Sequence, residues 1–391
     1  MPKTKGQSPK ATLMKKDISI ESEYIETELN SPSYKAIVSP FSPNDIRLST
    51  PPMNMGDIID MIQYHYIDFD TEYQREQNLW DDTQQSRLIE SVLLGLRLPA
   101  FYFEEVSKKK WRIIDGLQRC CTIRNFYVDK TLRLQNMEFL TDFEGKTIDD
   151  FPFEIKRDIR MLPVTVNVLE NGVPDDVKYI LFKRLNTGGI TLSTQEIRNA
   201  VYIGKAIDII KEMSVYPAFT SATLNTIPTL RKQDMDFVSR FVAFYLIGYE
   251  NYTVPDLDEF INTCMKGIKK GEYDDKTETM KRDFVKAMNL ASQIFGDDAF
   301  RKRTSKKDYR RPLNKAYFEV ISVGLAKLSD EESKKLLLHK ELFKDNLIKE
   351  MKDNQSYSGA FSSGTAKKES VRKRFSVFNE ILIKSINGIK I

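Results

Sequence analysis

Residues 111–126 read WRIIDGLQRCCTIRNF, and this stretch combines a strand, a turn and a helix. The apolar segment Trp111–Ile114 predicts a strand, and Gln118–Val128 predicts a helix. Asp115 stands where the helix N-cap is expected, and Gln118 follows three residues later, which is the spacing of a capping box. Gly116 permits a sharp backbone turn and the close approach of a ligand. The stretch therefore predicts a strand–turn–helix unit within a mixed α+β domain.

Hydrophobic patterns on both sides of this unit extend the α+β prediction. Alternating apolar residues rich in β-branched side chains predict strands, and apolar residues spaced three and four apart predict helices. The expected strands are Tyr66–Phe69, Pro99–Glu104 and Pro163–Leu169. The expected helices are Met53–Tyr64, Thr83–Leu94, Val177–Leu185 and Ser193–Val201. Beyond about residue 205 the strand signals stop, and the apolar segment Phe237–Ile247 predicts a central core helix.

The order of these elements predicts three regions. Residues 1–44 are polar and punctuated by Pro, Ser and Lys, so we expect a disordered or extended arm. Residues 45–205 are expected to form the α+β domain. Residues 206–391 are expected to form an all-helical domain.

Composition argues against several classes of protein. The chain has 391 residues, and 60 Lys and Arg nearly balance 56 Asp and Glu, so the net charge of +4 is weak evidence for nucleic-acid binding. Three cysteines argue against a disulfide framework, and no apolar run reaches the length of a membrane span. The first residues lack the apolar core of a secretory signal, so we expect a cytoplasmic location. The two histidines are too few for a His-rich zinc site, and the sequence around His339 does not resemble an HNH nuclease.

The groups around Asp115 suggest a phosphate cradle. A helix N-terminus presents N–H groups and a partial positive charge, and Arg119 and Arg124 add guanidinium donors. Asp115, Gln118 and Arg119 are the candidate catalytic residues, with Gly116 and Arg124 as candidate phosphate-binding residues. The alternative is that Asp115 only caps a helix and the arginines are solvated, and for this motif alone that alternative is favoured.

A second segment lies before the helix expected at Thr83. Tyr73, Gln74 and Arg75 offer a stacking ring, an amide and a guanidinium, and Trp80 follows. These are candidate nucleotide-binding residues. The alternative is a surface loop in which Trp80 is a core anchor.

A third segment joins two expected helices. Asn186, Thr187, Gly188 and Gly189 predict a tight loop whose backbone N–H groups would face an anion. Ser193 and Glu196 have the spacing of a capping box for the following helix. The other candidate ligands on that helix are Gln195, Arg198 and Asn199. The alternative is an ordinary helix connection in which these side chains only tie the helices together.

In this order and at these separations, the three segments resemble the GmrSD restriction-endonuclease N-terminal family, which is related to the ParB/sulfiredoxin-like nucleotide-binding fold. The resemblance covers about residues 50–205. The family motif Asp-Gly-Gln-Gln-Arg is matched by residues 115–119, except that Leu117 replaces the first Gln. Tyr-Gln-Arg matches residues 73–75, and Phe-x-Arg-Leu-Asn-Thr-Gly-Gly matches residues 182–189. Leu-Ser-x-Gln-Glu-Leu-Arg-Asn matches residues 192–199, with Ile197 in place of Leu.

The resemblance implies a domain that binds and hydrolyses nucleoside triphosphates, within a system that restricts modified phage DNA. Arg119 and Arg75 would hold phosphates, and Asp115 would hold Mg²⁺ or orient water. A capping role for Asp115 competes with this, because one carboxylate rarely does both. Relatives often carry a C-terminal HNH nuclease, which is expected to be missing here, so a separate nuclease subunit is a candidate partner.

Two other functions stand beside this hypothesis. A non-catalytic DNA-binding or regulatory protein would contact phosphates through a basic run that comprises Arg301, Lys302, Arg303, Lys306, Lys307, Arg310 and Arg311. The alternative for this run is a solvated helix end or loop. The third hypothesis is a DNA nickase that uses the turn at Asp115, although the sequence shows no carboxylate cluster for metal-assisted cleavage.

Overall fold

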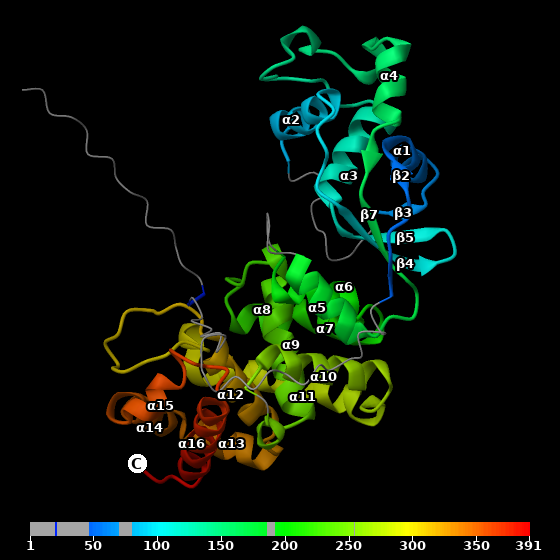
Figure 1. Ribbon diagram of the computed structural model, residues 1–391. Coiled ribbons are helices and arrows are strands. Elements are labelled where there is room, and N and C mark those ends of the chain that lie inside the picture. Colours follow the sequence, from blue (N-terminus) through cyan, green and yellow to red (C-terminus); the bar gives the residue numbers. More distant parts are fainter. Residues whose placement is uncertain (1–19, 22–46, 70–79, 186–191, 254) are drawn as a thin grey trace, which may run out of the picture.

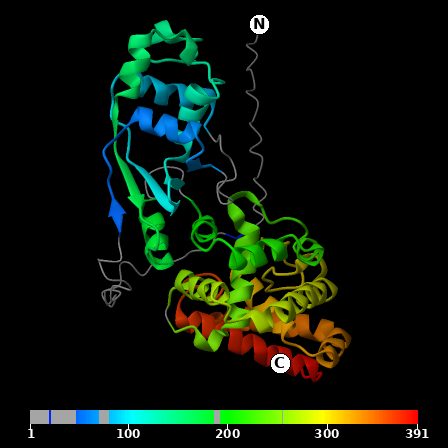
Figure 2. The ribbon, with the colours of Figure 1, turned by 90° about the vertical axis from the view of Figure 1, so that its right-hand side faces the viewer.

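The computed structural model describes residues 20–21, 47–69, 80–185, 192–253 and 255–391. They form a part that contains the sheet, at the top of Figure 1, and a helical body below it. Figure 2 shows the same two parts after a turn of 90°. An α+β fold followed by a helical C-terminal region is thereby confirmed, whereas the ParB-like topology stays a prediction.

The sheet part is built from short strands and helices. Its strands are β1 (Leu48–Ser49), β2 (Met53–Asn54), β3 (Ile67–Asp68), β4 (Phe101–Ser107), β5 (Lys110–Asp115), β6 (Pro163–Val164) and β7 (Val166–Leu169). Its helices are α1 (Met55–Gln63), α2 (Asp82–Leu93), α3 (Leu117–Ile123) and α4 (Phe153–Arg160), and α3 continues into the π-helix η3 (Arg124–Val128). The strand expected over 163–169 is divided, because β6 pairs with β2 while β7 joins the main sheet.

The main sheet has the strand order β1-β7-β4-β5-β3 and is mixed. The strands β4 and β5 form an antiparallel hairpin in which Phe103 lies opposite Ile113. β7 runs parallel to β4 on one side, and β3 runs parallel to β5 on the other. The carboxyl end of β5 therefore brings Asp115 opposite Tyr102, beside the start of β4.

One face of the hairpin forms the core of the sheet part. Phe101, Phe103 and Ile113 are fully buried and pack in one cluster with apolar residues of α1 and α3, including Ile58 and Ile123. Their alternation along the strands explains why the pattern was readable in the sequence. This packing fixes α3 against the sheet, with its first residue directly after the turn.

The helical body contains α5 (Asp175–Leu185), α6 (Thr194–Val201), α7 (Lys205–Ser214), α8 (Pro217–Ala222), α9 (Gln233–Leu246), α10 (Leu257–Lys269), α11 (Asp274–Phe295), α12 (Lys315–Ala326), α13 (Asp330–Leu338), α14 (Lys340–Asp353), α15 (Gln355–Gly359) and α16 (Lys368–Ile386). All residues of α9 from Asp234 to Phe244 are buried, which confirms the predicted central helix. Within the described residues, no helix is long and apolar enough to span a bilayer.

A buried chain of charged side chains connects three helices of this body. Arg240 of α9 donates to Glu319 of α12 at 2.8 Å, and Arg374 of α16 donates to the other Glu319 oxygen at 2.5 Å. Asp236 lies 3.3 Å from Arg240 and 2.8 Å from Lys315. Burial alone would raise the pKa of Asp236, but these cations outweigh it and hold the pKa below its usual range. The network therefore fixes the mutual placement of α9, α12 and α16.

The helices α5 and α6 pack into the helical core, and Ile114 of β5 and Leu169 of β7 belong to the same buried cluster. Tyr179, Phe182 and Ile197 belong to the same buried cluster as α9 and α12. Across to the sheet, Lys178 of α5 donates to Glu104 of β4 at 2.5 Å, and Arg112 of β5 donates to the second Glu104 oxygen at 3.2 Å. The proposed boundary near residue 205 thus lies beyond two helices whose side chains pack in the helical body, and the domain division itself stays a prediction.

Candidate functional site

The turn between β5 and α3 depends on Gly116. Its φ of +103° lies in the left-handed region, where side chains with a Cβ are strained. A Cβ atom at this position would lie 2.8 Å from Cδ1 of Phe101 and 3.2 Å from Nη2 of Arg119. Glycine is therefore required here both for backbone conformation and for space, as the sequence suggested.

Asp115 does not cap the helix, so that prediction was wrong. Gly116 is the N-cap residue of α3, and no side chain accepts a hydrogen bond there. The Asp115 carboxylate instead accepts a hydrogen bond from Nη2 of Arg119 at 2.8 Å, one helical turn away. Its side chain is 46% exposed, so it remains open to solvent while one oxygen is held.

Arg119 is buried and already bonded on several sides. Nη1 donates to the carbonyl oxygens of Pro99 and Ala100, the latter at 3.2 Å. The guanidinium carbon lies 4.6 Å from the centre of the Phe101 ring. The residue joins α3 to the start of β4. Most of its guanidinium N–H groups already donate to protein oxygens, so few are left to bind a phosphate.

Gln118 connects the turn to the segment that precedes α2. Its Oε1 accepts a hydrogen bond from the backbone N–H of Trp80 at 3.3 Å. Gln85 Nε2 donates to the Trp80 carbonyl at 3.0 Å, and Asn125 Nδ2 donates to Gln85 Oε1 at 2.8 Å. Sequence reasoning missed Gln85 and Asn125, although both are buried amides on helices that flank the turn. Tyr73, Gln74 and Arg75 lie outside the described residues.

Arg124 begins the π-helix that follows α3. Its guanidinium lies 4.7 Å from the centre of the Phe69 ring, and its Nε lies 3.4 Å from Asp129. π-helical turns are frequent at functional sites. Arg124 thus lies one helical segment beyond the turn, beside β3.

The polar residues of α6 form hydrogen bonds within the helical body. Asn186, Thr187, Gly188 and Gly189 lie outside the described residues. Ser193 and Glu196 form the predicted capping box, with Ser193 N–H donating to Glu196 at 2.6 Å.

The remaining α6 candidates are buried in the helical body. Arg198 donates to Asn262 at 3.2 Å and to Gln195 at 3.1 Å, and it also donates to Asp258. Gln195 donates to Asn199 at 2.9 Å. Arg198 thus ties α6 to α10, as the structural alternative expected.

The comparison with protein families fits this geometry. Residues 55–203 match the family model described as "GmrSD restriction endonuclease, N-terminal domain". This segment belongs to that family. No curated protein and no solved structure gives a match. The matched residues, called the GmrSD-type domain below, run from α1 to just after α6. They include the sheet part except β1 and β2, and the first two helices of the helical body.

Leu117 is the position at which this sequence differs from the Asp-Gly-Gln-Gln-Arg motif, and it is part of the core. It is buried and packs in the cluster with Phe101 and Cys120. An apolar residue at this position therefore contributes to packing beneath the turn, which leaves Asp115 and Gln118 as the polar residues on it.

The basic run beyond the GmrSD-type domain forms a loop between α11 and α12. Arg301 and Lys302 are buried, with Arg301 donating to the Arg311 carbonyl at 2.5 Å and Lys302 to Glu21 at 2.7 Å. Arg303 donates to Asp298, and Lys306 lies 2.5 Å from Asp345. Lys307 and Arg310 are exposed. Part of this run therefore builds the loop rather than facing solvent.

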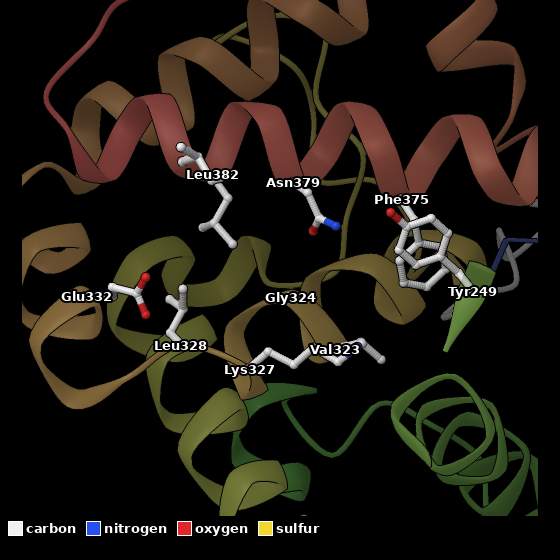
Figure 3. A pocket seen from close by; sticks show the side chains of 10 residues that line it. Tyr249, Val323, Gly324, Lys327, Leu328, Glu332, Phe375, Asn379 and Leu382 are labelled. Carbon is white, nitrogen blue, oxygen red and sulfur yellow. The ribbon is translucent and has the colours of Figure 1, made fainter. Parts of the chain in front are cut away.

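Two cavities among the described residues are lined by residues outside the Asp115 turn. A cavity of about 240 Å³ lies in the helical body, and Figure 3 shows Lys327, Glu332 and Asn379 along it. A second, of about 350 Å³, lies beside α1 near Tyr64. Among the described residues, no group of three or more His, Cys, Asp or Glu side chains is arranged to hold a metal ion.

Proposed function

We propose that this chain is a DNA-associated component of a restriction-type system, and that its GmrSD-type domain binds a nucleoside triphosphate with Mg²⁺ at the Asp115 turn. The observation that carries the proposal is the state of the Asp115 carboxylate. It is 46% exposed, it is held by a buried arginine, and it takes no part in capping α3. The competition between capping and metal binding is thereby removed.

The residues at the turn suit Mg²⁺ better than a metal that needs many protein ligands. Mg²⁺ is usually held by one or two carboxylates together with water and phosphate oxygens. Asp115 would supply the carboxylate, and the bound cation would neutralise phosphate charge. Gln118, whose carbonyl oxygen is tied to Trp80, would hold the preceding segment against the nucleotide.

Arg119 takes a different role from the one that the motif suggested. Its donors reach Pro99, Ala100 and Asp115, so it positions the carboxylate instead of gripping phosphate. Phosphate contacts are then proposed for Arg75 and for residues 186–189, as the motifs suggest. Hydrolysis would follow from electrostatic positioning of the phosphates and of a water molecule.

DNA binding without nucleotide chemistry is the second candidate function. The loop that contains Lys307 and Arg310 favours it, because these cations are exposed and lie outside the GmrSD-type domain. A separate nuclease subunit would then cut the DNA.

Titration of the purified protein with ATP, GTP and CTP, with and without Mg²⁺, tests the first proposal. We expect binding that strengthens with Mg²⁺, measured by calorimetry, and release of phosphate measured in parallel. No binding of any of the three nucleotides would refute it. Binding without phosphate release would support a nucleotide-sensing role and exclude nucleotide hydrolysis.

A further inference from the structure

The loop at residues 301–313 concentrates the positive charge of the chain. It reads RKRTSKKDYRRPL, with seven basic residues and one acidic residue, whereas the whole chain has a net charge of only +4. The remainder of the chain is therefore slightly acidic. In Figure 1 this loop, drawn in gold, stands out from the side of the helical body.

Asp308 gives the loop a fixed shape. Its carboxylate accepts hydrogen bonds from the Thr304 N–H at 2.7 Å, from the Thr304 hydroxyl at 3.0 Å and from the Ser305 N–H at 3.2 Å. The backbone bond from Thr304 is the main reason that the pKa of Asp308 is lowered. Arg303 donates to the Asp308 carbonyl at 2.6 Å. Side chains beyond Asp308 are thus presented from an ordered backbone.

The base of the loop is anchored to the body by its own basic residues. Arg301 donates to the Arg311 carbonyl, which closes the loop at 2.5 Å. Lys302 is bonded to Glu21 and, at 3.0 Å, to Ser362. Arg301 and Lys302 therefore hold the loop in place.

Three residues at the tip of the loop have exposed side chains that a partner could contact. Tyr309 is 94% exposed, and Lys307 and Arg310 flank it with exposed side chains. Within the described residues, no ion-pair partner lies beside the cations of Lys307 and Arg310. Burial and the nearby charge of Arg310 lower the pKa of Arg301, so like charges face each other in this loop.

We propose that the tip of this loop binds single-stranded DNA, with a base stacked on Tyr309 and phosphates held by Lys307 and Arg310. Exposed aromatic rings beside cations are the means by which proteins bind single strands, because every unpaired base offers a face for stacking. A polyanion would also relieve the repulsion between Arg301 and Arg310. The proposal deepens the DNA association of the proposed function and does not depend on nucleotide binding.

Fluorescence anisotropy of the full chain with labelled oligo(dT), and with a duplex of the same length, tests the proposal. The Tyr309→Ala variant is expected to bind oligo(dT) on the order of tenfold more weakly, with an unchanged salt dependence, and Tyr309→Phe to restore binding. The double variant Lys307→Ala/Arg310→Ala is expected to make the slope of log K against log salt shallower by about 1.4.

Matched controls separate the loop from general effects. Tyr64→Ala removes another exposed ring, and Lys276→Ala/Lys334→Ala removes two exposed positive charges elsewhere. Both are expected to bind as the wild type does. If oligo(dT) does not bind, if only the duplex binds, or if the loop variants bind unchanged, the proposal is overturned. Nucleotide titrations of the loop variants are expected to match the wild type, so failure here is distinguishable from failure at the Asp115 turn.

Discussion

Replacement of Gly116 by Ala tests whether the turn requires a residue without a Cβ atom, through the loss in the free energy of unfolding. The variant has two separate costs. A residue with a Cβ at a left-handed φ costs about 1–2 kcal/mol. The new Cβ would also lie 2.8 Å from the Phe101 ring, and such overpacking of a core costs about 1–3 kcal/mol. The expected loss in the free energy of unfolding is therefore about 2–5 kcal/mol.

Gly145→Ala is the matched control. Gly145 also has a left-handed φ, of +75°, but no atom lies within 4 Å of a Cβ placed there. This variant is expected to show only the conformational cost, about 1–2 kcal/mol. The difference between the two variants isolates the close approach of Phe101 and Arg119 to the turn.

Urea unfolding followed by tryptophan fluorescence is the suitable assay. The chain has two tryptophans, Trp111 on β5 and Trp80 bonded to Gln118, so the signal reports the sheet part. With a slope on the order of 2–3 kcal/mol/M, Gly116→Ala is expected to lower the midpoint by about 0.7–2.5 M. A Gly116→Ala midpoint equal to that of Gly145→Ala would refute the reasoning about the turn.

Three further predictions concern buried polar groups. Burial alone would raise the pKa of Glu90, but hydrogen bonds from the backbone N–H groups of residues 138–140 outweigh burial and lower the pKa. Replacing the carboxylate by an amide, Glu90→Gln, is therefore expected to cost about 1–3 kcal/mol of unfolding free energy at neutral pH. This contribution is present above the unfolded pKa and is lost as the pH falls through the lowered folded pKa, so urea midpoints of wild type and variant should converge in acid, and parallel pH profiles would contradict it. Arg119→Lys is expected to cost about 1–3 kcal/mol, because an ammonium cannot reach two carbonyls and a carboxylate as a planar fork does; thermal unfolding equal to wild type would exclude a positioning role. Glu319→Gln leaves the buried Arg374 without its carboxylate and Arg240 with Asp236 alone, so it is expected to cost about 3–5 kcal/mol in chemical unfolding monitored by circular dichroism, and no measurable loss would show that the network is not needed.

Local pattern predicted the elements well where their signals are local. The helix expected at Thr83–Leu94 is α2 at Asp82–Leu93, and the capping box of Ser193 and Glu196 is present as expected. The strand at 163–169 was divided because β6 and β7 join different sheets, and pairing partners far along the chain decide that.

The roles of the site residues could not be predicted in the same way, because their partners are distant in sequence. Asp115 has capping-box spacing, but Arg119 competes for the carboxylate and Gly116 occupies the N-cap. Arg119 bonds to carbonyls some twenty residues earlier, and Arg198 bonds to Asn262. The spacing of the motif predicts which residue types lie near the turn. The role of each residue depends on its burial and on hydrogen-bond partners that are distant in the sequence.

The comparison of Asp115→Asn with Asp129→Asn tests the central claim most directly. Both carboxylates are 46% exposed and paired with an arginine, but Asp129 lies beyond the turn, after η3. Calorimetric titration with the nucleotide that binds the wild type is expected to show that Asp115→Asn abolishes the strengthening by Mg²⁺, while Asp129→Asn retains it. If Asp115→Asn binds the Mg²⁺–nucleotide as tightly as Asp129→Asn does, the Asp115 turn is not the nucleotide site.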